Sequence, residues 1–264
     1  MSYPNVIYGD FGDEKVAQST AIGSLPLGQL MILPDGRKFR HGQAAAASLL
    51  AGQIVSTSAA VSKHGDASGS GLLASATVTN NAIGNTAVIL LTNSAAITKD
   101  QYAGGYLHVM GPAASTYIGH VYRIKSNLSC AVSAKATITL EPTDPLKVAF
   151  KAGTTICGLR RSSYKDLIVN DGATVIAPVM GAVPVAVSTS FYFWTQRSGE
   201  ASLLQAETVL VNGTAIIASS VEAGSVTVAL SASAALTISI NRHLGQALMT
   251  AAASQAVLCY LTLE

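Results

Sequence analysis

Short runs that alternate apolar with polar residues, broken by Gly, Asn, Ser or Pro, constrain the fold of this chain more than any other sequence feature. The clearest runs are residues 137–140, 191–196 and 226–230, where β-branched or aromatic side chains recur at every second position. A period of two is that of a strand with one buried face, and these residue types favour strands. The pattern, with breaks about every ten residues, predicts an all-β chain built of sandwich or barrel modules.

Turn signals accompany the strand pattern. Asn212 and Gly213 lie between two apolar runs, and Asn-Gly supplies the two positive-φ residues of a type I′ hairpin turn. Pro34, Asp35 and Gly36 form the second signal, in which proline fixes φ at the first central position of a turn. We therefore expect a hairpin around the first pair and a turn at the second site.

One stretch departs from the alternation. Residues 42–51 are rich in Ala and Leu, which are strong helix formers, and Gly52 follows them as a helix-ending residue. We expect one short helix there. Residues 1–40 show little periodicity and carry much of the charge of the chain, which predicts a partly extended N-terminal arm that becomes ordered against a partner.

The expected division of the chain has three parts. Residues 160–166 form the most polar stretch between two charge-poor blocks, so a domain boundary is placed there. The prediction is an N-terminal arm with the short helix at residues 1–60, a first β domain at residues 61–163 and a second β domain at residues 164–264.

Charge is scarce in this chain. Of its 264 residues 49% are hydrophobic and 11% charged, and the formal net charge is +2 at pH 7. Such a chain can bury enough apolar surface to fold. A charge this low, spread over the whole chain, gives no track for phosphates, so we expect no nucleic-acid partner. Windows without any charged residue, such as 67–98 and 172–196, are typical of protein interfaces and predict a homo-oligomer, a large assembly or both.

Neither a membrane span nor a catalytic motif emerges from the sequence. The best span candidate, residues 175–187, is 13 residues long and holds two prolines, whereas a bilayer helix needs roughly 20 apolar residues. The five histidines lack metal-ligand spacing, and there is no nucleophile elbow and no Walker loop. We expect no membrane partner, no cofactor, no metal site and no enzymatic activity.

Two groups of residues are candidates for a binding or contact site. Phe191, Tyr192, Phe193 and Trp194 gather the single Trp and three other rings in one run; they suit a core strand or an aromatic stacking platform. The second group surrounds the turn at residues 33–40, where arginines flank a phenylalanine. It suits a solvated hairpin tip or an anchor in which Arg pairs with carboxylates while Phe buries.

The order of several segments resembles virion structural proteins of tailed bacteriophages, many of them marine. The resemblance extends from about Gly28 onward and rests on the ordered set rather than on any one piece. Its segments are LPDGRKFR at 33–40, YAGGYLHV at 102–109, GHVYRIKSN at 119–127, ITLEPTDPL at 138–146, FYFWTQRSG at 191–199 and LGQAL at 244–248.

The resemblance implies a capsid decoration, or cement, protein without catalytic residues. Such a protein would be made in the host cytoplasm, bind the major capsid protein on the outer surface of the assembled shell, and bridge capsid subunits as a homo-oligomer, with a trimer favoured. The shell contacts expected in the N-terminal arm are Phe11, Arg37, Phe39 and Arg40.

The sequence leaves two alternative functions open. A carbohydrate- or receptor-binding β-sandwich of a head fibre or tail would use Tyr192 or Trp194 to stack on sugars; exposed rings would support this function and buried rings would oppose it. An all-β hydrolase would need acidic residues brought together only by the fold.

Overall fold

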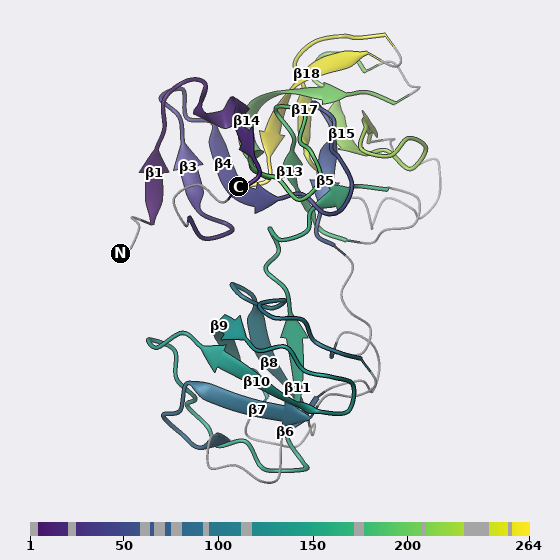
Figure 1. Cartoon of the computed structure of the whole chain (residues 1–264). Coiled ribbons are helices and arrows are strands. Elements are labelled where there is room, and N and C mark those ends of the chain that lie inside the picture. Colours follow the sequence, from purple (N-terminus) through teal and green to yellow (C-terminus); the bar gives the residue numbers. More distant parts are fainter. Residues whose placement is uncertain are drawn as a thin grey trace. The chain divides into compact units, whose positions relative to one another are not determined.

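The computed structural model describes residues 5–20, 25–58, 64–65, 72–74, 81–91, 95–111, 118–171, 177–206, 210–229, 243–252 and 255–264. Within these residues the regular structure consists of strands β1 to β18 and one 3₁₀-helix, η1 (Asp13–Lys15), with no α-helix (Figure 1). The prediction of an all-β chain is confirmed.

Two compact units divide the chain. Unit 1 combines Met1–Ala59 with Ser163–Glu264, and unit 2 is Ala60–Ser162, so unit 2 is inserted within unit 1. The first 59 residues are therefore not the separate arm that the sequence predicted. They belong to unit 1 because β4 (Lys38–Gln43) pairs along its length with β14 (Tyr192–Leu204).

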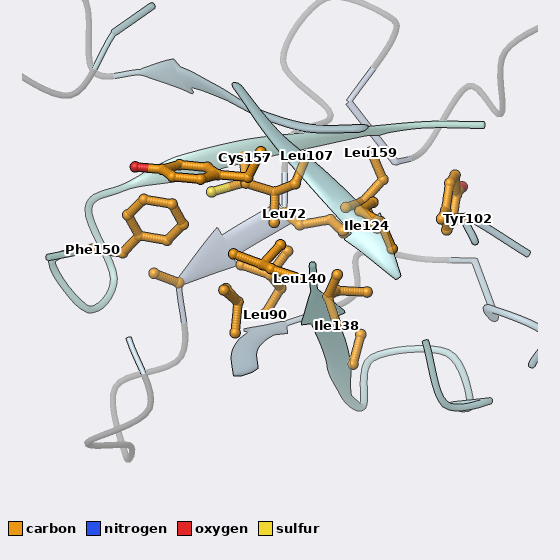
Figure 2. Close-up of a cluster of buried hydrophobic side chains, with 14 of the residues drawn as sticks. Leu72, Leu90, Tyr102, Leu107, Ile124, Ile138, Leu140, Phe150, Cys157 and Leu159 are labelled. Atoms are coloured by element: carbon orange, nitrogen blue, oxygen red, sulfur yellow. The ribbon is translucent and has the colours of Figure 1, made fainter. Parts of the chain in front are cut away.

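The described residues of unit 2 form a closed barrel of six antiparallel strands in the order β10-β7-β6-β11-β8-β9. Buried and accessible side chains alternate along its strands, as a period of two requires. Figure 2 shows apolar side chains from different strands converging on the barrel interior. The strands are β6 (Leu72–Ala74), β7 (Ala87–Leu91), β8 (Tyr106–Gly111), β9 (Val121–Asn127), β10 (Lys135–Leu140) and β11 (Ile156–Arg160).

Twelve strands of unit 1, within its described residues, pair into one sheet with the main order β1-β3-β4-β14-β18-β17-β15-β16. The long strand β14 connects the two parts, because its first half pairs with β4 and its second half with β18. The other strands are β1 (Val6–Tyr8), β2 (Ala17–Gln18), β3 (Leu30–Ile32), β5 (Ile54–Ser56), β12 (Ile168–Val169), β13 (Val179–Ala182), β15 (Ala215–Ala218), β16 (Val226–Val228), β17 (Gly245–Ala247) and β18 (Ala256–Thr262).

The first half of strand β14, as far as Arg197, is buried on both faces. Neighbouring residues of a strand point to opposite faces of the sheet. Phe193 packs in a cluster with Leu167 and Val187, whereas Trp194 packs in a different cluster with Met31 and Phe39. The aromatic run therefore supplies the largest side chains of two hydrophobic clusters of unit 1.

The predicted helix at residues 42–51 is wrong. Gly42 and Gln43 end strand β4, the Ala44 N–H donates to the Phe191 carbonyl at 2.8 Å, and the Leu49 N–H donates to the Val187 carbonyl at 2.9 Å. A helix this short is marginal by itself. The neighbouring extended segments supply hydrogen-bond partners for its backbone, and this tertiary pairing outweighs the helix propensity of alanine.

The turn at Pro34 is confirmed. Pro34 and Asp35 are its central residues, and the Gly36 N–H donates to the Leu33 carbonyl at 2.9 Å. Gly36 adopts φ 86°, which glycine tolerates without strain, and the chain then enters β4. This turn joins β3 to β4, so the segment predicted to be a loose arm forms an antiparallel hairpin inside unit 1.

The hairpin predicted at Asn212 and Gly213 is wrong, although a turn is present there. The Thr214 N–H donates to the Val211 carbonyl at 3.0 Å, but only Gly213 has a positive φ, so the turn is not of type I′. The apolar run after the turn, β15, pairs with β16 and β17. Before the turn, Leu210 instead bridges to Ala251.

Candidate interaction surfaces

A hydrogen-bonded loop follows the edge strand β1. We call residues 8–16 the N-terminal hook. The Gly9 N–H donates to the Ile32 carbonyl at 3.0 Å, and the Asp10 N–H donates to Asp13 Oδ2 at 2.9 Å. The buried Glu14 accepts from the Gly12 N–H at 2.7 Å. These bonds fix the hook before any partner arrives.

The hook presents aromatic rings to solvent. Tyr8 is 82% exposed, Phe11 65% and Val16 43%. Asp10 and Asp13 are exposed beside them. Exposed aromatic residues on a preorganised loop, surrounded by charge, have the composition of a protein contact site. Phe11 is thus the member of the four expected shell contacts whose side chain is open to a partner, and sequence reasoning missed the adjacent Tyr8.

Phe39 is not a surface contact, which corrects the sequence expectation. Its side chain is fully buried in a cluster with Met31, Leu33 and Trp194. Alternation explains the burial, because in β4 residues 39 and 41 face inward while Lys38 and Arg40 are half-buried.

Arg37 and Arg40 are committed to bonds within unit 1. Arg37 Nε lies 2.6 Å from Asp35 Oδ2, and its guanidinium carbon lies 5.7 Å from the centroid of the Phe39 ring. Arg40 Nη2 lies 2.6 Å from Glu264 Oε1, and Arg40 Nη1 donates to the Gly28 carbonyl at 2.9 Å. A partner would have to compete with these carboxylates for either guanidinium.

The second half of the aromatic run lies in the core. Phe193 is fully buried and Trp194 is 4% exposed, whereas Phe191 and Tyr192 are half-buried. Tyr192 stacks on His41, with ring centroids 5.6 Å apart. Trp194 offers no open face to a sugar, and this burial opposes the glycan-binding alternative.

His41 is a buried titratable group beside these rings. It has no exposed surface, and its ring centroid lies 5.3 Å from that of Trp194. Burial lowers the pKa of His41 below its usual 6.5, and the nearby carbonyls of Pro26 and Leu25 offset this only in part. Neither ring nitrogen makes a well-formed hydrogen bond to a described residue.

Unit 1 is expected to lose stability on acidification through His41. Between the lowered folded pKa and the unfolded value near 6.5, the unfolded chain binds the extra proton. The free energy of unfolding therefore falls as pH drops below that value, by at most about 1.4 kcal/mol per pH unit. Urea unfolding followed by Trp194 fluorescence at neutral and acidic pH measures this loss of stability. His41→Phe should make the stability of unit 1 depend less on pH. The control His243→Gln, at an exposed histidine, should leave the pH dependence unchanged.

A row of three side chains crosses the outer face of the barrel. The strand register places Arg160 of β11 and Arg123 of β9 on either side of Tyr106 of β8. The Arg123 guanidinium carbon lies 5.3 Å from the centroid of the Tyr106 ring, and Arg123 Nη1 donates to the Tyr106 hydroxyl at 2.9 Å. Met110 of β8 is 37% exposed and Val121 of β9 is 55% exposed. We call this surface the basic row.

Sequence reasoning missed the basic row, although its signal is in the sequence. Residues 106–110 and 121–125 each alternate in character, so their outward positions could be assigned as soon as both runs were read as strands. What the sequence does not contain is the register that brings Arg160, Tyr106 and Arg123 side by side, because that depends on which strands pair.

Charge is divided unequally between the units. Unit 2 contains nine Lys and Arg against four Asp and Glu, a net charge of +5, whereas unit 1 contains seven against ten, a net charge of −3. The whole-chain value of +2 conceals this division. Arg123 makes no ion pair with any described residue, so its charge is available to a partner.

Reactive chemistry is sparse in the part of the chain that the structure describes. No group of three His, Cys, Asp or Glu side chains there could hold a metal ion. Burial raises the pKa of the Cys157 and Cys259 thiols to about 12, which keeps them protonated and unreactive at neutral pH. No helix among the described residues has the length and apolar character that crossing a bilayer requires.

Comparison of the chain with protein-family models, curated proteins and solved structures finds no match.

Proposed function

We propose that this chain is a non-catalytic structural protein of a tailed-phage virion. In this proposal it is made in the host cytoplasm, binds the major capsid protein on the outer surface of the assembled shell, and stabilises the shell by bridging capsid subunits. The ordered segments described above, which resemble virion structural proteins, support this function. The all-β architecture is compatible with it but would suit many other functions.

The observation that carries the bridging role is the presence of two separately packed units on one chain. The barrel core and the clusters of unit 1 share no residue. Two such bodies can each engage a different subunit of a lattice, and after the first has bound, the second binds as an intramolecular step. A protein that binds the assembled shell and not the dispersed subunits stabilises the shell by mass action.

Adding the purified chain to expanded shells built from the major capsid protein of the same phage is expected to raise the temperature at which the shells disassemble. The rise should grow with the logarithm of the free protein concentration and accompany saturable co-sedimentation. Light scattering during heating and a sedimentation assay measure the two effects, with dispersed capsid subunits as the control that should not bind. A chain that stays in the supernatant at saturating concentration would refute the proposal.

The glycan-binding alternative has weaker support, because Trp194 is buried and Tyr192, the other candidate ring, is half-buried and stacked on His41. A glycan array is accordingly expected to give no signal, and Trp194 fluorescence should not change with sugars. A specific glycan hit that shifts this fluorescence would favour the alternative.

A further inference from the structure

We infer that the N-terminal hook of one copy binds the basic row on the barrel of a second copy. This contact goes beyond the proposed function, since it would form between copies free of any shell. It assigns a partner to two surfaces of the chain, the hook and the outer face of β8, β9 and β11.

The two surfaces are where the exposed apolar side chains of each unit gather. In the described part of unit 2, four of the seven exposed large hydrophobic side chains lie on β8, on β9 or just before β9: Tyr106, Met110, Ile118 and Val121. In the described part of unit 1, three of eight lie in the nine residues of the hook: Tyr8, Phe11 and Val16. Elsewhere such side chains are scattered, which needs no explanation.

The opposite charges of the two surfaces favour a second copy of the chain as the binding partner. The exposed charges of the hook are those of Asp10 and Asp13 against Lys15, because Glu14 is buried and lies 3.5 Å from Arg37 Nη2. The surface of the hook is therefore acidic. Unit 2, which contains the barrel, has a net charge of +5. Opposite charges on the two surfaces favour their encounter and oppose pairing of like surfaces.

The chemistry of the two surfaces is also complementary. Asp10 and Asp13 are exposed carboxylates, and guanidinium groups such as Arg123 bind carboxylates with paired, charge-assisted hydrogen bonds. Phe11 can then cover the apolar side chains of Met110 and Val121. Because its backbone is already fixed, the hook loses little conformational freedom on binding.

A contact between two different surfaces is head-to-tail. It leaves a free hook at one end and a free basic row at the other, so copies add until the chain of contacts closes into a ring or continues as a filament. This property gives a test that separates the proposal from contacts through a single self-complementary surface.

The test uses two variants of the full chain and sedimentation velocity. The hook variant carries Asp10→Asn and Phe11→Ala; the barrel variant carries Arg123→Gln and Lys125→Gln, the latter at an exposed lysine on the same strand. Wild type is expected to oligomerise with concentration and to dissociate as salt rises. Each variant alone should associate at least tenfold more weakly, and an equimolar mixture should form dimers, because one intact hook meets one intact barrel.

Two control variants and four contrary results complete this test. Val211→Ala and Lys151→Gln, at exposed side chains outside both surfaces, should oligomerise like wild type, and hydrogen exchange should show every variant folded. A monomeric wild type, or folded variants whose mixture stays monomeric, overturns the proposal. A hook variant that still oligomerises but loses shell binding assigns the hook to the shell instead. Binding of a single-stranded oligonucleotide that the barrel variant loses assigns the basic row to nucleic acid.

Discussion

Phe39→Ala is expected to lower the free energy of unfolding of unit 1 by about 3–5 kcal/mol, the usual cost of removing a buried phenylalanine. The ring is fully buried against Met31, Leu33 and Trp194, on a strand that pairs with the central strand β14. Its removal leaves a cavity that this sheet cannot easily close, because β4 is held between β3 and β14.

The measurement of this loss is selective for unit 1. Trp194 is the single tryptophan of the chain and lies in the same cluster as Phe39, so its fluorescence during urea unfolding reports on that unit. Phe11→Ala is the matched control, because the same side chain is removed at a 65% exposed position; its effect should stay within about 0.5 kcal/mol. Equal effects of the two substitutions would contradict the burial described here.

Gly105→Val is expected to disrupt the barrel of unit 2. A Cβ atom at residue 105 would lie 2.1 Å from the Arg160 carbonyl oxygen and 2.9 Å from that of Tyr102. Both are backbone atoms, so the main chain itself would have to move where β8 pairs with β11. Inserting bulk into packed structure costs about 1–3 kcal/mol when side chains can adjust, and we expect a larger loss here because they cannot.

Gly111→Ala is the control for this substitution. Gly111 is the last residue of β8, whereas Gly105 immediately precedes that strand. A Cβ atom at Gly111 would meet only the side chain of Ile156, at 3.5 Å or more. Hydrogen exchange of peptides from β8 to β11 distinguishes the two: protection should be lost with Gly105→Val and kept with Gly111→Ala. Retained protection in both would mean that the close approach at residue 105 is relieved by backbone adjustment.

The sequence predicted strands better than it predicted their partners. The run at residues 191–196 was recognised by its aromatic and β-branched residues, and it lies almost wholly in β14. Its partner β4 is about 150 residues earlier in the chain, and nothing local to either strand encodes that pairing. For the same reason Asn212 and Gly213 correctly marked a turn but did not reveal that the strand after them pairs elsewhere.

For the candidate contact residues too, part of the arrangement followed from local sequence and part did not. Alternation in residues 38–41 would have placed Phe39 and His41 on one face, but the density of arginines around Phe39 suggested a surface anchor. Those arginines lie at the margin of unit 1, bonded to Asp35 and Glu264. Low charge over the whole chain also hid the basic barrel, because charge averages cannot show segregation before the unit boundaries are known.

The insertion of unit 2 within unit 1 has a consequence for the order of folding during synthesis. All strands of the barrel lie between residues 60 and 162, so it can close as soon as that segment has left the ribosome. Strands β1 to β5 emerge earlier but lack β14 and β18 until the end of the chain is made. Their edges, with the side chain of Phe39, are exposed meanwhile, and this is the interval in which aggregation or chaperone binding should concentrate.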